Sequence, residues 1–343
     1  MRYRRSDPVL PGRQRGAALV LALLVFAICA AIIVSMHRDF NRVYQQAGNS
    51  MLAQQSGVYL RGAEELAALA LQVDYDQDMA NELRRDDLEE VWARDEVPYP
   101  LDEGGWLSGY LEDLQGRFNL NNLAKRAPGG EGKSRFTPAQ QQFIRLLLAL
   151  EEPALSEPEA ISITEAIGDW LDADSNVRLD GAEDDHYFGL APAYRSANQA
   201  MASTSELRSV AGVTAELYLA LQPWVTVWPQ VPAKLNVHTA PAMVLRSLGE
   251  NDSLVPLSES DALALVEYRK ENGFSDRRDV KNHPVLADRL DNMSDQLGLL
   301  GESSDYFLLR ARVEVADRNM RLYSVLQREG RTVTAVVRAS GSL

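Results

Sequence analysis

The side chains with the most evident chemistry lie between residues 169 and 188, in the stretch DWLDADSNVRLDGAEDDHYF. It holds six Asp and one Glu against a single Arg, Arg178. Its oxygen-bearing side chains follow the ligand spacing of an EF-hand calcium loop, with Asp172 first, Asp174 third, Asn176 fifth, Asp180 ninth and Glu183 twelfth. Val177 stands where that loop needs Gly. Two interpretations remain open: a site for a hard cation such as Ca²⁺, or an acidic loop in solvent.

The rest of the sequence does not favour zinc chemistry or catalysis. The only cysteine is Cys29, inside an apolar segment, and paired His ligands, HExxH and GxSxG are absent. Paired carboxylates can act as general acid and base, but calcium accounts better for their crowding here. We therefore predict that the chain is not an enzyme, and a calcium-dependent hydrolase outside the cytoplasm is an alternative.

A glycine-rich stretch, APGGEGKS at residues 127–134, loosely fits a nucleotide-binding loop. Such a loop places its Lys and Ser on the first turn of the next helix, so that the helix amides face the phosphates. Here Thr137 and Pro138 are typical of an N-cap and a first turn, so the helix starts after the motif. We interpret the stretch as a surface loop.

The elements that position these residues begin with an anchor. Residues 17–36, AALVLALLVFAICAAIIVSM, carry no formal charge. At ~1.5 Å per residue they form a helix of about 30 Å, the thickness of the hydrocarbon core of a bilayer. A cleaved secretory signal has a shorter core followed by small residues. Here the small residues Gly16, Ala17 and Ala18 lie at the start of the apolar run, which indicates a single membrane crossing.

The charges on either side of the anchor indicate its orientation. Residues 1–16 carry five Arg and one Asp, a formal +4, so the remaining 327 residues hold a formal −18 to give the total of −14. Short flanks rich in Arg stay in the cytoplasm, so the acidic body is expected outside it. Such a body is a poor partner for nucleic acid, which needs clustered Lys and Arg.

The leader and the anchor together resemble a type IV prepilin signal. In that signal a prepilin peptidase cuts after a Gly on the cytoplasmic side and leaves the apolar segment attached. Here the bond would join Gly16 to Ala17. Most such proteins have Glu at the fifth mature position, whereas this chain has Leu21. This departure resembles the K-type minor pseudopilins of type II secretion (the GspK family), and the resemblance extends over nearly the whole chain.

The resemblance implies an α+β, type IV pilin-like fold, with a long N-terminal helix packed on an antiparallel sheet and a large inserted all-α domain. The expected parts are a leader (1–16), a transmembrane segment (17–36), a pilin-like helix with the first strands (37–123), an inserted domain of two helical subdomains (124–300) and C-terminal strands (301–343). Calcium binding by the helical domain is implied as well. The resemblance to the calcium-binding region is strongest at DWLDAD and GAED, so the implied calcium ligands are Asp172, Asp174, Glu183 and Asp184.

The resemblance also implies a structural role at the tip of the periplasmic pseudopilus, where the subunit helps to initiate the fibre for protein export across the outer membrane. The implied partners are the I-type and J-type minor pseudopilins, the major pseudopilin, prepilin peptidase and the inner-membrane secretion platform. The implied location is the inner membrane, with the N-terminus cytoplasmic and the body periplasmic. N-terminal methylation belongs to the same expectation.

Periodicity and breaks in the sequence predict the remaining elements. The anchor helix is expected to continue over 37–72, because no Pro occurs from Ala17 to Val97. Residues 74–100 are acidic and helix-prone and end in Val-Pro-Tyr-Pro, which stops a helix. Trp106–Leu114 and Arg117–Leu123 are expected to form a hairpin about Gln115-Gly116. Helices are predicted at 138–151, 157–171, 203–210, 213–222, 239–249, 258–272 and 284–298. A meander is predicted at 306–315, 320–328 and 331–339, with Phe307, Leu309, Ala311, Val313 and Val315 on one face.

Two segments within the helical part also resemble the helix-hairpin-helix modules of DNA-uptake proteins. They are SELRSVAGVTAELY and the pair LNVHTAPAMVLRSLG with DALALVEYRKENGFSDRRDV. The first has Thr214 in place of the second Gly of the usual turn, and basic residues do not dominate either segment. We interpret them as protein-packing helices. A membrane-anchored DNA-binding protein is the main alternative function.

Overall fold

A computed structural model describes residues 17–94, 96–102, 104–128, 134–287, 293–316 and 318–340. The expected leader, with Gly16, lies outside the described residues, as does most of the glycine-rich stretch at 127–134. The chain divides into two compact units, residues 1–58 and residues 59–343. The first long helix contributes to both.

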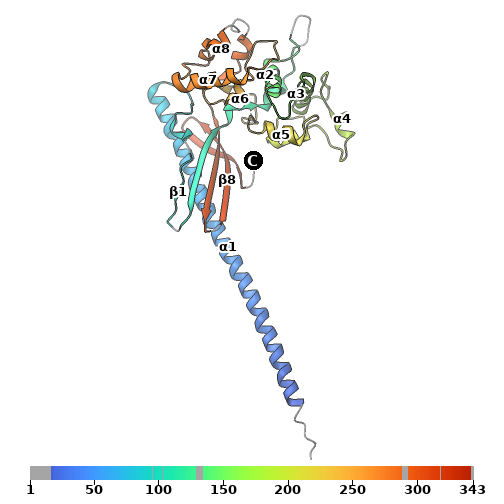
Figure 1. Ribbon diagram of the computed structural model, residues 1–343, viewed down its shortest axis with the longest axis vertical. Coiled ribbons are helices and arrows are strands. Elements are labelled where there is room, and N and C mark those ends of the chain that lie inside the picture. The colour runs from blue at the N-terminus through green and yellow to red at the C-terminus, as the bar shows by residue number, and fades with distance from the viewer. Residues whose placement is uncertain are drawn as a thin grey trace, which may run out of the picture. The chain divides into compact units, whose positions relative to one another are not determined.

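Helix α1 spans Ala17–Asn81 without interruption (Figure 1). Its first 20 residues are apolar and almost wholly exposed, and it is the one described helix long and apolar enough to cross a membrane. The helix continues nine residues past the predicted 72 and stops where Glu82 adopts a left-handed conformation, with φ of 55°. The prediction of helical character over 74–100 was therefore correct only as far as Asn81. Beyond it, the 3₁₀ turn η1 Val91–Ala93 precedes the first strand.

The main sheet has five antiparallel strands in the order β1-β2-β7-β8-β9. They are β1 Tyr99–Pro100, β2 Trp106–Asp113, β7 Tyr306–Val315, β8 Arg318–Glu329 and β9 Thr332–Ala339. The predicted C-terminal meander is confirmed, and the five apolar residues assigned to one face of β7 are all buried. Within the second unit, Leu60, Ala67 and Leu71 of α1 are buried. Glu64 accepts hydrogen bonds from Ser324 of β8 and Arg338 of β9, which fastens the helix to the sheet.

The predicted hairpin about Gln115-Gly116 is wrong. Strand β2 does join the main sheet, but it pairs with β7. The chain then passes through the 3₁₀ helix η2 Leu114–Gly116, and β3 Phe118–Asn119 pairs in parallel with β4 Val225–Thr226. The alternation in FNLNNL does not mark an exposed strand face, because most of these residues are buried and Leu120–Ala124 form the 3₁₀ helix η3. The Asn side chains bond backbone instead: Asn121 donates to the carbonyls of Met201 and Val227.

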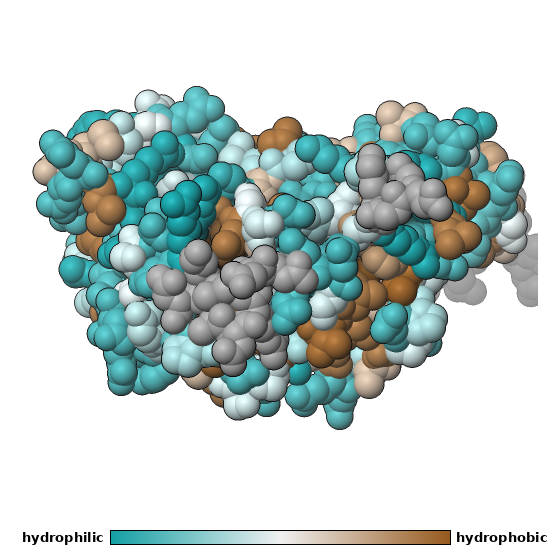
Figure 2. Space-filling model, turned by 90° about the horizontal axis from the view of Figure 1, so that it is seen from above, coloured by the Kyte–Doolittle hydropathy of each residue, from teal (hydrophilic) through white to brown (hydrophobic). Residues whose placement is uncertain are grey.

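The helical region has two hydrophobic cores. The first is built from α2 Pro138–Leu148, α3 Glu157–Leu171, α4 Asp184–Phe188, the 3₁₀ helix η4 Thr204–Ser209 and α5 Ala215–Leu221. The second contains α6 Ala242–Leu245, α7 Glu259–Asn272, η5 Asp279–Asn282, α8 Pro284–Ala287, α9 Ser294–Leu297 and the parallel pair β5 Leu235–Asn236 with β6 Leu300–Gly301. Both groups gather at one end of the main sheet (Figure 1), and hydrophilic residues cover most of the face seen in Figure 2.

The predicted helices differ in how closely they match. The prediction for α3 is exact, and those for α2 and α7 err by at most three residues at either end. The predicted helix 239–249 shrinks to the four residues of α6, and within the predicted helix 284–298 the described residues form α8 at Pro284–Ala287 and α9 at Ser294–Leu297. The predicted helix 203–210 is a 3₁₀ segment. The two-residue strands within this region were not predicted.

A buried arginine links the two cores. Arg145 of α2 is fully buried, and its guanidinium donates to the carbonyls of Ser247, Glu250 and Ser253 at 2.6–3.2 Å and to Gln296 Oε1 at 2.8 Å. Burial lowers the pKa of Arg145 to about 10. Since every acceptor comes from the second core, this side chain fixes one helical group to the other.

Candidate functional site

The C-terminal end of α3 positions the acidic loop. The helix begins in a capping box formed by Ser156 and Glu159. Its buried face carries Ile163, Ile167 and Trp170 into the first core. That packing places Asp169 inside, with no exposed surface, and makes Asp172 the C-cap at the point where the chain leaves the helix.

Arg178 forms the inner wall of the loop. Its guanidinium donates to Asp172 Oδ2 at 3.0 Å and to the carbonyls of Leu123 and Ala124, while its backbone N–H donates to Asp169 Oδ2 at 3.1 Å. Two glycines permit this close packing. A Cβ on Gly168 would lie 1.8 Å from Arg178 Nη1, and one on Gly181 would lie 2.0 Å from Asp169 Oδ2.

A second arginine, Arg126, contacts the loop from the solvent side. It follows η3, and its side chain is 36% exposed. Its Nε donates to Asp172 Oδ2 at 3.2 Å, and its Nη2 donates to Asp174 Oδ1 at 3.3 Å and to the carbonyl of Asn176. One guanidinium thus joins the first, third and fifth positions of the acidic spacing. Sequence reasoning did not find it, because Arg126 lies 46 residues before Asp172.

The other two predicted ligands lie around a serine. Ser196 Oγ donates to Glu183 Oε2 at 2.9 Å, and Asp184 Oδ1 accepts from the backbone N–H of Ser196 at 3.0 Å. Two carboxylate oxygens of the loop, Asp172 Oδ1 and Glu183 Oε1, are buried without a hydrogen-bond partner. Leaving a buried carboxylate oxygen unpaired is costly, so these two oxygens fit a bound cation.

The electrostatics of the loop agree with that fit. Burial raises the pKa of Asp169 to about 6, and the charges of Asp172 and Glu183 add to the effect. Burial also raises the pKa of Glu183, again with a contribution from Asp172. Five carboxylates (Asp169, Asp172, Asp174, Glu183 and Asp184) face two guanidinium groups here, a formal −3. Hard oxygen donors with excess negative charge are the ligands that calcium prefers.

The loop does not follow an EF-hand. The sixth position of an EF-hand needs the sharp turn that Gly supplies, but Val177 has no positive φ. Asp180, counted as the ninth position, contacts Arg135 Nη2 at 2.5 Å, and its backbone N–H donates to Glu165. The EF-hand spacing is therefore not kept at the ninth position, and calcium binding by this stretch stays a prediction. Among the described residues, the four carried-over acids do not bring three carboxylates within 4.8 Å of one another.

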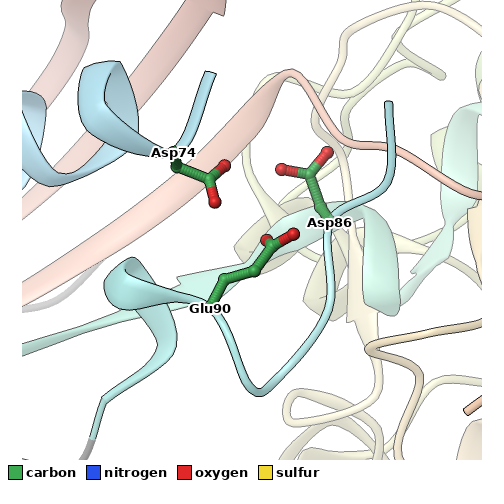
Figure 3. A group of neighbouring side chains, drawn as sticks. All are labelled: Asp74, Asp86 and Glu90. Carbon is green, nitrogen blue, oxygen red and sulfur yellow. The ribbon is translucent and has the colours of Figure 1, made fainter. Parts of the chain in front are cut away.

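A different set of carboxylates does converge that closely, and it was not predicted from the sequence. Asp74 of α1, Asp86 and Glu90 each place an oxygen within 4.8 Å of the others, and Figure 3 shows the three side chains pointing toward one another. Arg328 of β8 fills the space beside them, with Nη1 2.8 Å from Asp74 Oδ2 and Nη2 2.5 Å from Asp86 Oδ1.

Protonation completes the charge balance of this second cluster. Burial and the charge of Asp74 raise the pKa of Glu90 to about 9, and Glu90 hydrogen-bonds Asp74. Burial raises the pKa of Asp86 to about 7 against the opposing charge of Arg328. A neutral Glu90 and one arginine leave little excess charge for a metal. We therefore interpret the cluster as a link between α1, the segment after it and β8.

Two of the four arginines in the second helix-hairpin-helix segment, Arg246 and Arg269, donate to carbonyls within the protein, whereas Arg278 is exposed. Arg269 donates to the carbonyls of Val237 and Ala240, and burial lowers its pKa to about 10. Arg246 donates to the carbonyls of Leu257 and Ala149. Side chains that bind phosphate must face solvent, so Arg246 and Arg269 serve packing within the protein rather than phosphate binding.

Together, the fold and the sites define a class of protein. A membrane-length helix continues into a body where it packs on an antiparallel sheet, and a helical region is inserted between the strands. This is a pilin-like subunit, enlarged by the inserted region. Sequence comparison gives the family: the family described as "Type II secretion system (T2SS), protein K" matches residues 116–230 and again 235–299. The chain belongs to the protein K family of type II secretion systems.

Individual relatives agree. The chain is 31% identical to the type II secretion system protein K of Pectobacterium carotovorum subsp. carotovorum, over 96% of this chain and 97% of that protein. It is 35% identical to the protein K of Pseudomonas aeruginosa, over 92% and 89%. In a crystal structure of the GspK-GspI-GspJ complex of enterotoxigenic Escherichia coli, a chain with 27% identity matches with a TM-score of 0.72 over 87% of this chain and all of that one. The predicted family and fold class are thereby confirmed.

Proposed function

We propose that this chain is a minor pseudopilin that sits at the tip of the type II secretion pseudopilus and helps to initiate it for protein export across the outer membrane. The observation that carries the proposal is the structural match, over 87% of this chain, to a chain from a complex of GspK with GspI and GspJ. The subunit acts by binding neighbours, and no catalytic role is proposed.

That complex supports the I-type and J-type partners, and the major pseudopilin and the inner-membrane platform belong to the same proposal. The I-type and J-type minor pseudopilins bind this chain, the major pseudopilin continues the fibre below them, and the inner-membrane secretion platform supports assembly. The apolar start of α1 anchors the subunit in the inner membrane until it is extracted. The basic leader keeps the N-terminus in the cytoplasm, so the acidic body faces the periplasm.

Co-purification tests the assembly. The full chain, carrying an affinity tag after residue 343, is expressed with the I-type and J-type subunits of the same secretion system and purified in detergent. A stable complex containing all three is expected. Matched expression with an unrelated single-pass protein is the control. Recovery of the chain alone under conditions where the I-type and J-type subunits bind each other would contradict the proposal.

Processing by prepilin peptidase between Gly16 and Ala17 is part of the same proposal. It leaves Ala17 as the N-terminal residue of the mature chain, where methylation would take place. Intact-mass measurement of the membrane form checks this. An uncut leader, or a cut after Met36, would show that the prepilin interpretation is wrong.

Leu21 supports the tip position. In pilin-like assemblies a Glu at the fifth mature position pairs with the N-terminal amine of the subunit ahead, since a charge within a bilayer costs roughly 2.5–3.5 kcal/mol. A subunit with Leu21 has no charge to neutralise, so it needs no subunit ahead of it, while its own amine remains available to the next subunit. Gold labelling of sheared fibres is expected at one end only. Label spread along the fibres, with the wild-type chain or with Leu21→Glu, would contradict the tip assignment.

The last part of the proposed function is calcium binding by the acidic loop. Asp172, Asp174, Glu183 and Asp184 would hold the ion, and the two unpartnered oxygens, Asp172 Oδ1 and Glu183 Oε1, support this set. The ion would neutralise the loop and connect the end of α3 to the start of α4. The proposed role of the ion is structural, because it would make the inserted helical region more rigid where that region binds its partners.

A further inference from the structure

The guanidinium of Arg126 lies where the first oxygens of the acidic loop converge. Three oxygens from alternate residues accept its N–H groups: Asp172 Oδ2, Asp174 Oδ1 and the carbonyl oxygen of Asn176. A fourth, Asp169 Oδ1, lies 3.5 Å from Nη2. Alternate residues supplying oxygen to one positive centre is the arrangement by which a calcium loop begins. Here the positive centre is the guanidinium of Arg126, a group of the protein itself.

The side chain of Arg126 can be displaced from the acidic loop more easily than that of Arg178. Arg178 is 6% exposed, donates to two carbonyls behind the loop and fits against Gly168 with no spare space. Arg126 is 36% exposed and comes from the segment after η3, and its hydrogen bonds and ion pairs with described residues are all made to residues 169–176. Its side chain also lines an open cavity of about 460 Å³, next to Asn122 and Lys125. A released Arg126 side chain therefore has a solvent-filled space to enter.

Arg126 does not pair with all of the buried carboxylate oxygens of the loop. Asp172 uses Oδ2 for both arginines, while its Oδ1 is buried without a partner, as is Oε1 of Glu183, a residue only 5% exposed. A guanidinium presents donors in one plane and cannot reach oxygens on every side. A small spherical ion can bind six to eight oxygens in a flexible geometry.

We propose that Arg126 is a built-in competitor for calcium: it holds the ligand oxygens of Asp172, Asp174 and Asn176 together when calcium is absent and is displaced when calcium binds. The proposal rests on the calcium binding proposed above and adds how that binding is set. Arg126 preorganises the site, weakens its apparent affinity for calcium and couples calcium binding to release of the Arg126 side chain.

Calcium titration calorimetry on the full chain in detergent tests the competition. Removing Arg126 in Arg126→Gln should tighten calcium binding about tenfold, because a partly exposed ion-pair network is lost only from the calcium-free state. Lys125→Gln is the matched control. It removes the same charge from the neighbouring residue and the same cavity, but Lys125 has no ion pair with the loop among the described residues. It should change the affinity less than about threefold.

Chemical labelling of arginine gives a second measurement. If Arg126 had only a structural role, calcium would not change the extent of its labelling. Phenylglyoxal reacts with free guanidinium groups, and mass spectrometry locates the product. Calcium should increase labelling of Arg126 severalfold over EDTA and leave the buried Arg178 protected. Tighter binding in Arg126→Gln together with this increase supports the competition, as does calcium binding that is seen only in the variant.

The outcomes separate the two proposals. If wild type binds calcium but Arg126→Gln binds with unchanged or weaker affinity, or if calcium protects Arg126 from labelling, the competition is wrong and the calcium site stands. If neither wild type nor variant binds calcium, both proposals are wrong. The minor pseudopilin assignment is tested by co-purification and is affected by neither result.

Discussion

Two groups of carboxylates in this molecule have their negative charge balanced in different ways. Asp74, Asp86 and Glu90 are gathered from α1 and the segment after it, and Arg328, 242 residues beyond Asp86, pairs with two of them in a buried site. The acids of the loop between Asp172 and Asp184 are neighbours in sequence, meet two arginines, and keep two buried oxygens without partners.

The difference indicates what each group is for. A cluster closed by a buried arginine and a shared proton has its charges satisfied by folding alone, so it stabilises one arrangement of the chain. A loop with a formal excess of negative charge and an exposed, replaceable arginine is suited to exchange one cation for another. The first holds α1 to the sheet, and the second is the candidate for regulation by an ion.

The largest expected effect comes from removing the arginine of the closed cluster. Arg328→Met leaves Asp74 and Asp86 buried without a cation, and breaking a buried pair in this way costs roughly 3–5 kcal/mol. Urea unfolding of the full chain in detergent, followed by tryptophan fluorescence, should show the loss. The matched control is Arg331→Met, because Arg331 is 63% exposed in its pair with Asp76. Its unfolding midpoint should remain close to wild type. Equal effects of the two variants would show that burial does not distinguish the pairs.

Calcium should give the next largest effect, and only through the open loop. At a hundred times its dissociation constant, an ion bound by the folded state alone adds about 2.7 kcal/mol, and roughly 2–4 °C of melting temperature accompanies each kcal/mol in a body of this size. The double variant Asp172→Ala with Glu183→Ala should lose this shift. Asp86→Asn, in the closed cluster, should keep it. An unchanged wild-type melting temperature on adding EDTA would mean that the loop is simply solvated.

A smaller effect is expected from pH at Glu90. The folded state raises the pKa of Glu90 to about 9 from an ordinary value near 4.5. The folded state therefore binds the extra proton, and stability present below about pH 4.5 is lost progressively as pH rises toward 9. Glu90→Gln mimics the protonated form, so it should stabilise the chain by at least about 1 kcal/mol at pH 8 and have little effect at pH 4.5. A variant that follows the wild-type pH profile would show that Glu90 is ionised in the folded state.

The contrast between the two groups also explains which of them the sequence could predict. The acidic loop was found because its members are close in sequence and their spacing carries chemical meaning. The closed cluster was not found because its members become neighbours only when β8 packs beside α1. Trp92 donates to Glu90 at 2.7 Å, and nothing in the local sequence pattern predicts this contact or the partial burial of Glu90.

The same reasoning applies to the fold. Long periodic elements such as the C-terminal meander and α3 were predicted correctly, since their patterns are local. The hairpin about Gln115-Gly116 failed because Asp113 accepts a hydrogen bond from the backbone of Gln115 and starts a 3₁₀ turn. Asn119 then bonds the carbonyls of Pro229 and Val231, more than 100 residues away. Such distant acceptors cannot be read from a local pattern.

The smallest expected effect tests whether the loop is truly open. Asp174 has a side chain 50% exposed, and its Oδ1 accepts from Arg126 and from the backbone N–H of Asn176. Hydrogen bonds from the backbone and side chain of Asn176 lower the pKa of Asp174, with a smaller contribution from the charge of Arg126, and an Asn side chain at this position can still accept hydrogen bonds. In EDTA, Asp174→Asn should therefore change the melting temperature by less than about 2 °C, as exposed polar changes usually do. In saturating calcium the same variant should lose part of the calcium-dependent shift, because an amide oxygen is a weaker ligand than a carboxylate. A large loss of stability in EDTA would mean that the loop, like the cluster at Arg328, is closed by its own arginines.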